Sequence, residues 1–230
     1  MINNKSILAI IPARGGSKGL PNKNILKVMN KPLIAWTIEE SLKSKYIDNV
    51  VVSTDDQNIA NISKIYDVEK IILRPSHLAS DSATTAAVLK YEINLIKKTF
   101  DLLILLQPTS PLRTVEDIDN AIEMIDKNNT SSLVSVSENK HPIEWIVELN
   151  KKNMIKKSSI LNSLKIRQDS SNSYRLNGAI YISYVRDFLK NNSFFTNNTL
   201  AFIMPEHKSI DIDDKHDFKI ASLLMYDRDN

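Results

Sequence analysis

Short apolar runs alternate along the chain with segments whose apolar residues recur every three or four positions. A continuous apolar run predicts a strand buried on both faces, and the longer period predicts a helix with one buried face. Strands are predicted at residues 7–11, 50–52, 71–73, 102–106, 132–136 and 178–183, and helices at 32–42, 59–66, 83–98, 114–125 and 215–226. Strands that alternate with helices predict an α/β fold.

The alternation breaks between about residues 138 and 175, where the chain is polar and rich in Lys, Asn and Ser. This segment nevertheless contains Trp145 and several Ile, Leu and Val residues, which is more apolar character than a disordered linker carries. We therefore expect one domain over residues 1–230, with an insertion at about 138–175 that packs against another surface. A second subunit is one candidate for that surface.

The composition is that of a globular protein, since 42% of the residues are apolar and 25% are charged. The first apolar run, residues 7–13, is far shorter than the roughly 18 residues that a membrane helix needs. Arg14 follows it at once, which disfavours a signal peptide. The absence of Cys excludes disulfides, thiolate metal ligands and cysteine nucleophiles. We expect a cytoplasmic protein with no membrane partner.

Positive charge is concentrated at the amino end of the chain. The first 38 residues contain six Lys or Arg residues and no Asp or Glu, so the remainder carries −3 of the total formal charge of +3. The same segment holds three of the four glycines, Gly15, Gly16 and Gly19. Glycine lets a ligand approach main-chain N–H groups, so the combination predicts an anion-binding loop. A solvated basic surface around a glycine turn is the alternative.

The glycine-rich loop, residues 13–24, directly follows the first predicted strand, and ligands of open α/β sheets bind beyond the carboxyl ends of strands. The loop lacks the GK[ST] ending of a Walker A loop and the GxGxxG spacing of a dinucleotide site. Both a P-loop ATPase and a dinucleotide-dependent oxidoreductase are therefore disfavoured. Three cations, Arg14, Lys18 and Lys23, beside consecutive N–H groups suit the phosphates of a nucleoside triphosphate.

Five segments, in order, resemble the motifs of the CMP-sialic acid synthetase (acylneuraminate cytidylyltransferase) family. They are IIPARGGSKGLPNKN at 10–24, RP at 74–75 with LASD at 78–81, QPTSPLR at 107–113, RLNGAIY at 175–181 and IDID at 210–213. The related 3-deoxy-manno-octulosonate enzymes lack the GGSKGLPNKN form and rank second. The resemblance implies a Rossmann-like, three-layer nucleotidyltransferase fold with a mostly parallel sheet and a small dimerisation insertion.

The reaction implied by the resemblance joins CTP to a nine-carbon sugar acid, N-acetylneuraminate, and releases pyrophosphate. The anomeric hydroxyl of the sugar attacks the α-phosphorus, which requires positioning and charge neutralisation more than a covalent nucleophile. Lys23 and Arg14 are implied as catalytic cations, with Lys23 at the α-phosphate. The nucleotide-binding residues implied are Ala13, Arg14, Gly15, Gly16, Ser17, Lys18, Asn24, Arg74, Asp81 and Thr85. A loop salt bridge and a helix cap are the alternative for the region of Arg74 and Asp81.

Asp211 and Asp213 lie two positions apart in a predicted extended segment, so their side chains face the same way. Two such carboxylates can hold a hard cation, with phosphate and water oxygens as its other ligands. Capping of the following helix by Asp213 or Asp214 is the alternative. The resemblance favours a metal, Mg²⁺ with Mn²⁺ as a substitute, and places Asp211 and Asp213 among the catalytic residues. Which group removes the proton of the sugar hydroxyl stays open.

The resemblance also implies residues that bind the sugar acid, whose carboxylate calls for the planar fork of arginine. These are Gln107, Thr109, Ser110, Arg167, Arg175, Asn177, Tyr181, Phe194 and Phe195. Family members are dimers in which the inserted segment reaches the active site of the neighbour. The resemblance thus implies a homodimer, in which the two arginines and the Phe194–Phe195 pair act from either subunit. Ordinary packing is the alternative for the phenylalanines.

Two other functions remain open. One is the same reaction on another nonulosonate, such as N,N'-diacetyllegionaminate, which would change only the sugar-binding residues. The other is a non-catalytic protein that binds a nucleotide or RNA through the basic loop. Aromatic residues make up only 7% of the chain, and none alternate with the basic residues as in a stacking surface, so a nucleic-acid partner is not expected.

Overall fold

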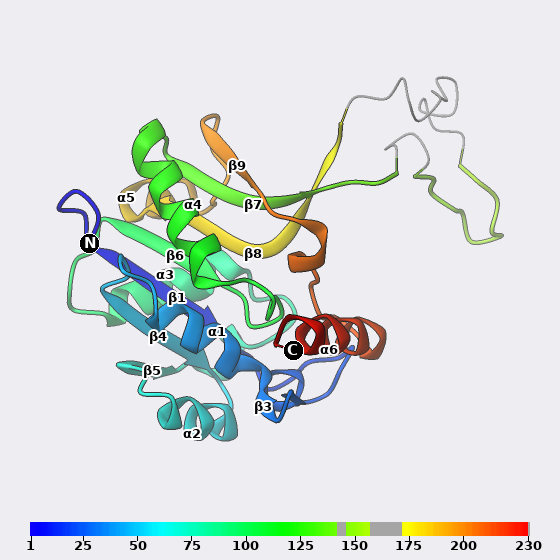
Figure 1. Cartoon of the computed structure of the whole chain (residues 1–230), viewed down its shortest axis with the longest axis horizontal. Helices are drawn as coiled ribbons and strands as arrows, with labels where there is room; N and C mark the ends of the chain where they lie inside the picture. The colour runs from blue at the N-terminus through cyan, green and yellow to red at the C-terminus, as the bar shows by residue number, and fades with distance from the viewer. Residues whose placement is uncertain (142–145, 157–171, 230) are drawn as a thin grey trace.

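The computed structural model describes residues 1–141, 146–156 and 172–229. Its centre is a seven-stranded sheet with the order β5-β4-β1-β6-β8-β7-β9 (Figure 1). The strands of the sheet are β1 (Ile7–Pro12), β4 (Asn49–Thr54), β5 (Lys70–Leu73), β6 (Leu102–Leu106), β7 (Ser132–Glu138), β8 (Tyr174–Tyr184) and β9 (Thr199–Ile203). A separate hairpin, β2 (Lys27–Val28) with β3 (Lys31–Pro32), follows the glycine-rich loop.

The sheet is mostly parallel, as predicted. β5, β4, β1 and β6 run in one direction, β8 is antiparallel to β6 and β7, and β9 is parallel to β7. The continuous apolar runs form the central strands, and every residue of β6 is buried. All six predicted strands are present, although β8 begins before the predicted residue 178. β9 is not among the predicted strands because its short apolar run is ambiguous between strand and helix.

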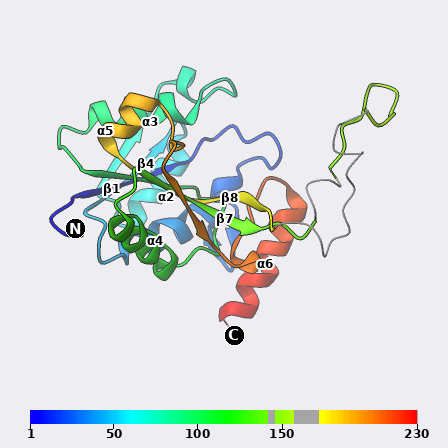
Figure 2. The same cartoon turned by 90° about the horizontal axis from the view of Figure 1, so that it is seen from above.

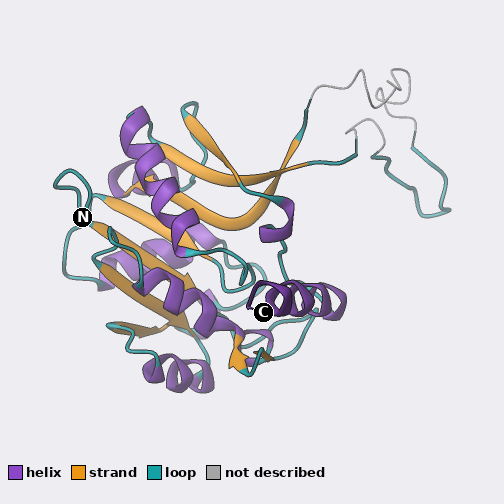
Figure 3. Ribbon diagram, viewed as in Figure 1, coloured by secondary structure: helices purple, strands orange, loops and turns teal. Residues whose placement is uncertain are grey.

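Helices cover both faces of the sheet and give the predicted three layers (Figures 2 and 3). They are α1 (Leu33–Leu42), α2 (Gln57–Ile65), α3 (Thr85–Leu95), α4 (Val115–Asn128), α5 (Val185–Asn191) and α6 (Lys215–Asp229). Alternate residues of β1 enter two cores: Ile7 and Ile11 pack with α1, α2 and α4, whereas Leu8 packs with α3 and α5. α6 packs against α1 in a third apolar cluster. None of the helices in the described ranges is long and apolar enough to cross a membrane.

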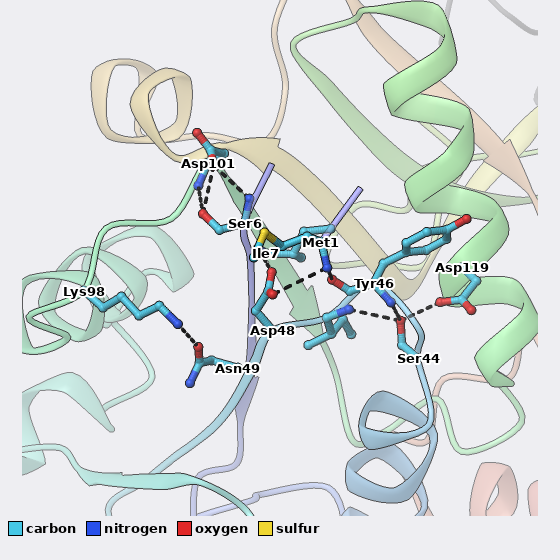
Figure 4. Close-up of polar contacts among 11 residues, drawn as sticks. Met1, Ser6, Ile7, Ser44, Tyr46, Asp48, Asn49, Lys98, Asp101 and Asp119 are labelled. Carbon is cyan, nitrogen blue, oxygen red and sulfur yellow. Dashed lines mark hydrogen bonds and ion pairs between the residues drawn. The ribbon is translucent and has the colours of Figure 1, made fainter. Parts of the chain in front are cut away.

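Carboxylates tie down the amino ends of the central strands (Figure 4). Asp48, just before β4, accepts a hydrogen bond from the Ile7 N–H at 2.7 Å. Asp101, just before β6, accepts from both the N–H and the hydroxyl of Ser6 at 2.8 Å, and these bonds hold the pKa of Asp101 below its usual range. The Lys98 ammonium donates to the Asn49 amide oxygen at 2.9 Å. This end of the sheet is therefore held by its own side chains.

A buried arginine holds the opposite, carboxyl end together. Arg113 is only 1% exposed and donates to the Ala179 carbonyl at 2.7 Å, the Gln107 carbonyl at 3.2 Å and the Thr37 hydroxyl at 2.7 Å. Its burial lowers its pKa to about 10. One side chain thus joins the turn after β6 to β8 and to α1. Burying a charged group is costly unless hydrogen bonds compensate it, and these three bonds do so for Arg113.

The predicted insertion lies between the ends of two paired strands, since β7 ends at Glu138 and β8 begins at Tyr174. Residues 146–156 lie to one side of the sheet, beyond these strand ends (Figure 1). A bridge between Leu149 and Ile155 folds this stretch back on itself. Ile146, Leu149, Met154 and Ile155 are each at least half exposed, so the described part of the insertion presents an apolar surface to solvent.

Replacing Arg113 is expected to destabilise the fold. Arg113→Ala leaves buried carbonyls without their charged donor, which should lower the free energy of unfolding by about 3 kcal/mol. Urea denaturation monitored by circular dichroism measures the change. Arg186→Ala is the matched control, because that side chain is 82% exposed, and it should lose less than about 1 kcal/mol. Equal losses in the two variants would contradict the structural role of Arg113.

Candidate active site

Two adjoining cavities open beyond the carboxyl ends of β1 and β6, and both are lined by Pro12, Arg14 and Gln107. The first cavity has a volume of about 290 Å³, and the second about 350 Å³. The first is also lined by Ser17, Lys18, Gly19, Lys23, Asn24, Thr109, Asp211 and Asp213. The second is also lined by Arg74, Leu78, Ser80, Thr85, Val88 and Leu89. The structure therefore brings most of the predicted nucleotide-binding residues to one edge of the sheet.

The glycine-rich loop is held in place by hydrogen bonds to the neighbouring strand ends. The Ala13 N–H donates to the Ser53 carbonyl at 2.8 Å, and the Gly15 N–H to the Asp55 carboxylate at 3.1 Å. The Asn24 amide spans the loop by donating to the Arg14 carbonyl at 2.9 Å. The N–H groups of Ala13 and Gly15 are therefore already bonded within the protein.

Gly19 brings this loop against the far end of the chain. A Cβ atom at Gly19 would lie 2.4 Å from the carbonyl oxygen of Asp213, which is too close for any side chain. At Gly16 a Cβ atom would have no neighbour within 4 Å. Of these two loop glycines, only Gly19 is required by a close approach of backbone to backbone.

The three cations of the loop are paired with carboxylates or a carbonyl. Asp81 accepts from Arg14 at 2.8 Å and from Lys18 at 2.5 Å, and these two cations hold the pKa of Asp81 below its usual range. The Lys23 ammonium donates to the Ile212 carbonyl at 2.5 Å and lies 3.2 Å from Asp213. The structure thus gives Asp81 a salt bridge with the loop, rather than with Arg74.

The two predicted metal ligands differ in exposure. Asp211 is mostly buried, and one of its carboxylate oxygens has no hydrogen-bond partner among the described residues. Burial raises the pKa of Asp211, against the lowering effect of the Thr109 hydroxyl. The Asp213 side chain is 80% exposed. Asp214 caps α6, because its carboxylate accepts hydrogen bonds from the N–H groups of His216 and Asp217 at 2.7 and 3.0 Å. The side chains of Asp211 and Asp213 are therefore not needed as the cap.

A glycine in β8 creates the space around Asp211. Gly178 has a φ of +74° and lies where the register between β7 and β8 shifts. A Cβ atom there would lie 2.7 Å from the Gln107 amide oxygen and 3.1 Å from the Asp211 carboxylate. Both polar side chains can therefore face the first cavity. The described residues contain no group of three His, Cys, Asp or Glu side chains placed to hold a metal, so any ion here would need ligands from a substrate or water.

The comparison with known proteins identifies the family of this chain. The family model described as cytidylyltransferase matches residues 8–200. The chain belongs to the cytidylyltransferase family. Its similarity to N-acylneuraminate cytidylyltransferase of Escherichia coli O18:K1:H7 is 37% identity over 95% of the chain, which spans about half, 52%, of that protein. Two further relatives are also 37% identical, and the chain covers 96% of each: the post-translational flagellin modification protein B of Campylobacter coli and the CMP-N,N'-diacetyllegionaminic acid synthase of Legionella pneumophila.

Solved structures confirm the predicted nucleotidyltransferase fold of this chain. The CMP:2-keto-3-deoxy-manno-octonic acid synthetase, solved with CTP, superposes with a TM-score of 0.74 at 19% identity, over 97% of this chain and 99% of that chain. A 4-diphosphocytidyl-2C-methyl-D-erythritol synthase from Anaerococcus prevotii gives a TM-score of 0.68 at 13% identity, over 96% of this chain and 99% of that chain. The predicted membership of the CMP-sialic acid synthetase family agrees with the sequence relatives.

Only part of the predicted sugar-binding set lies at the two cavities. Gln107 and Thr109 line the first cavity, whereas Ser110 is fully buried. Asn177 is also buried. Its side-chain amide accepts a hydrogen bond from the Ser135 hydroxyl at 2.6 Å and donates one to the Ser209 hydroxyl at 2.9 Å. These bonds hold the irregular part of β8. Asn177 is thus held within the fold of its own subunit.

The remaining described residues of the predicted sugar-binding set do not line the two cavities. Phe194 is buried and packs on Tyr181 and Phe188, with ring centroids 5.5 and 4.9 Å apart. Phe195 is half exposed, and Arg175 donates to the Ser137 hydroxyl at 3.2 Å. Arg167 lies outside the described residues. Phe194 therefore has the ordinary packing role that was the alternative to sugar binding. Phe195 and Arg175 are exposed and do not belong to the hydrophobic cores.

Two acidic residues whose charges act on Arg74, a residue that lines the second cavity, were missing from the sequence prediction. Asp55 binds the Gly15 N–H and lies 4.0 Å from the Arg74 guanidinium, and Glu92 is buried beside the same arginine. Asp55 directly follows a predicted strand, so its position at the carboxyl edge was available as a signal. Glu92 gave no such signal, because a lone Glu within a helix normally lies on the solvated face.

Enlarging Gly19 should disturb the junction between the loop and the Asp211–Asp213 segment. Gly19→Ala must displace the Asp213 backbone, so we expect a loss of roughly 1–3 kcal/mol in the free energy of unfolding and weaker binding of CTP. Thermal unfolding and calorimetric titration with CTP measure these effects. Gly16→Ala is the matched control in the same loop and should change stability by less than about 0.5 kcal/mol. The close contact would be unimportant if the two variants behaved alike.

Proposed function

We propose that this chain transfers CMP from CTP to the anomeric hydroxyl of a nonulosonic acid, with release of pyrophosphate. The observation that carries the proposal is the convergence of Arg14, Lys18 and Lys23 on the first cavity, which Asp211 and Asp213 also line. Membership of the cytidylyltransferase family supports CTP as the nucleotide. The Escherichia coli and Legionella relatives, named for an N-acylneuraminate and for N,N'-diacetyllegionaminic acid, support a nonulosonate as the acceptor.

In the proposed reaction, an oxygen of the sugar forms a bond to the α-phosphorus as the bond to pyrophosphate breaks. Lys23, Arg14 and Lys18 stabilise the negative charge that develops on the phosphates, and they exchange their protein carboxylates for phosphate oxygens. The hydroxyl proton passes to Asp211, to Asp213 or to water, and the sequence and the geometry leave this choice open. No covalent enzyme intermediate is required.

We propose Mg²⁺ as the cofactor, with Mn²⁺ as a substitute. Asp211 fits the role of a ligand because it holds a buried carboxylate oxygen that has no partner among the described residues, and Asp213 lies close by with its carboxylate exposed. Two carboxylates suit Mg²⁺, which usually binds one or two of them together with substrate phosphates and water. When bound, the ion would withdraw charge from the phosphates.

N-acetylneuraminate is the proposed acceptor, and N,N'-diacetyllegionaminate is the alternative. Relatives named for these two acids are equally identical to the chain, at 37%. Two further relatives, from Campylobacter jejuni and 30–31% identical, are named pseudaminic acid cytidylyltransferase. The sugar-binding residues would determine which acid is preferred, and several of the described ones do not line the cavities of the single chain.

We further propose a cytoplasmic homodimer. The apolar surface of residues 146–156 would be covered by a second copy, since Ile146, Met154 and Ile155 are each more than half exposed among the described residues. In such a dimer Arg167, Arg175 and Phe195 could reach the cavity of the neighbour. The cytoplasm is where CTP is available to the enzyme.

Incubation with each of the four nucleoside triphosphates, Mg²⁺ and each candidate acid tests the proposed function. We expect a CMP-sugar, identified by mass, together with pyrophosphate, only when CTP is supplied. The acid that gives the highest kcat/KM identifies the preferred acceptor. A protein that binds CTP but releases no pyrophosphate with any acid would instead be the non-catalytic nucleotide-binding alternative.

Lys23→Ala should remove most of the activity without unfolding the protein. The lysine side chain lines the first cavity at the proposed α-phosphate position, although only 12% of it is exposed, so we expect kcat to fall by about 10²–10³-fold. Lys27→Ala, an exposed lysine of the same basic segment, is the control and should keep wild-type turnover. Full turnover by Lys23→Ala, with the fold verified by circular dichroism, would rule out its assigned role.

Replacing the two aspartates should abolish the dependence on metal. Asp211→Asn and Asp213→Asn keep the size of each side chain and remove its charge, so we expect weak activity that no longer increases with added Mg²⁺. Titration of initial rates with MgCl₂ measures this. Asp67→Asn, in an exposed turn, is the control. Variants that still respond to Mg²⁺ as the wild type does would place the metal elsewhere.

A further inference from the structure

A chain of buried hydrogen bonds runs from β7 through β8 to the segment that carries Asp211. The Ser135 hydroxyl donates to the side-chain oxygen of Asn177 at 2.6 Å, and the side-chain nitrogen of Asn177 donates to the Ser209 hydroxyl at 2.9 Å. The Ser209 hydroxyl in turn donates to the Pro205 carbonyl at 2.8 Å. None of the three residues with bonded side chains is more than 3% exposed. Loss of one partner would therefore leave another buried polar group unpaired.

These side chains hold a bulge in β8. The register between β7 and β8 shifts around Ser135, where the regular ladder of main-chain bonds is interrupted. The Ser135 hydroxyl accepts the Ile180 N–H at 2.7 Å, and the side-chain oxygen of Asn177 accepts the Ala179 N–H at 3.2 Å. Side-chain oxygens thus replace main-chain acceptors at the bulge. Bulges are over-represented beside active sites, where they redirect side chains.

The bulge lies directly against the carboxylate of Asp211. Gly178, the residue after Asn177, has a φ of +74°, and a Cβ atom there would lie 3.1 Å from an Asp211 carboxylate oxygen. Ser209 lies two residues before Asp211. The hydrogen bond between Asn177 and Ser209 therefore joins the two segments immediately beside the point where Gly178 and Asp211 meet. This bond sets how far the Asp211 segment lies from the bulge.

Other bonds attach the same segment to other elements. The Lys208 ammonium lies 3.0 Å from the Asp117 carboxylate in the first turn of α4. The Ile212 N–H donates to the Thr109 carbonyl, after the end of β6, at 2.9 Å. The bond at Ser209 adds the tie to β8, the strand that carries the bulge. A segment held to three elements keeps its side chains at a fixed place in the first cavity.

We propose that Ser209 is a positioning residue, which holds the Asp211 carboxylate at the first cavity through its hydrogen bond with Asn177. The inference rests on the proposed function, since it concerns Asp211 as a ligand of the metal or as one of the candidate acceptors of the sugar proton. Ser209 is buried and does not line either cavity, so it acts through Asp211. The same bond engages Asn177 in the support of Asp211 rather than in contact with the sugar.

Ser209→Ala tests the inference by removing a single buried hydroxyl. We expect kcat to fall about tenfold with KM for CTP within about twofold, because Asp211 is displaced while the loop cations and the second cavity are untouched. Ser132→Ala is the matched control. This serine is also buried, at the start of β7, and its hydroxyl lies 2.8 Å from that of Thr199. Both variants should lower Tm by about 2–4 °C, but Ser132→Ala should keep the wild-type kcat.

Amide hydrogen exchange, followed by NMR, provides a readout that does not depend on turnover. The Ile212 N–H is bonded to the Thr109 carbonyl and directly follows Asp211, so its exchange reports on how firmly the segment is held. We expect it to exchange about tenfold faster in Ser209→Ala than in Ser132→Ala. Ser209→Cys keeps nearly the same shape with a weaker hydrogen-bonding group. It should show smaller changes in the same direction, and it replaces Ser209→Ala if that variant does not fold.

The outcomes separate the positioning role of Ser209 from the proposed function. A wild type that makes no CMP-sugar, together with faster Ile212 exchange in Ser209→Ala, would overturn the proposed function and support the positioning role. Ile212 exchange that is equal in Ser209→Ala and Ser132→Ala would overturn the positioning role. So would an active wild type whose kcat is unchanged in Ser209→Ala, or is lowered equally in both variants.

Discussion

The contact between Gly19 and the Asp213 carbonyl is the constraint on which the site depends. It joins a loop at the amino end of the chain to a segment nearly two hundred residues later, with no room for a side chain between them. The Lys23 ammonium reinforces the junction by donating to the Ile212 carbonyl, and the Ile212 N–H donates to the Thr109 carbonyl at 2.9 Å. Three distant segments therefore close around one cavity, which is lined by the loop cations and by Asp211 and Asp213.

The charges at this edge of the sheet fall into two groups. The first comprises exposed pairs, such as Lys18 with Asp81 and Arg14 with Asp81, which contribute little to stability in water and can be replaced by a polyphosphate at small cost. The second comprises the buried arginines Arg74 and Arg113, whose partners cannot be exchanged without leaving an uncompensated charge. The exposed pairs suit ligand exchange, whereas the buried groups maintain the shape of the cavities. This division explains how one short edge can be both charged and well ordered.

The sequence predicted the parts of the molecule that depend on local pattern. The continuous apolar runs located the strands at the centre of the sheet, and the glycine-rich loop identified the cavity-lining cations Arg14, Lys18 and Lys23. The prediction failed where tertiary context decides the outcome. β9 pairs only with β7 at the sheet edge, and Asn177 is drawn inward by Ser135 and Ser209, which no local pattern encodes. Glu92 is of the same kind, since only the packing of α3 against β4 buries it.

The topology of the fold separates the cavity-lining residues from most of the predicted sugar-binding residues. The residues that line the cavities follow the ends of β1, β5 and β6 or precede α6, all of which are fixed by the central cores. Arg175 and Phe195, by contrast, lie on β8 and in the segment before β9, and Arg167 belongs to the insertion. Relatives named for different acids share the same identity to this chain, so overall similarity does not discriminate between acceptors. Under the proposed dimer, the acceptor would be selected by residues that the neighbouring subunit contributes, whereas the phosphates would be bound by elements that the central cores hold in place.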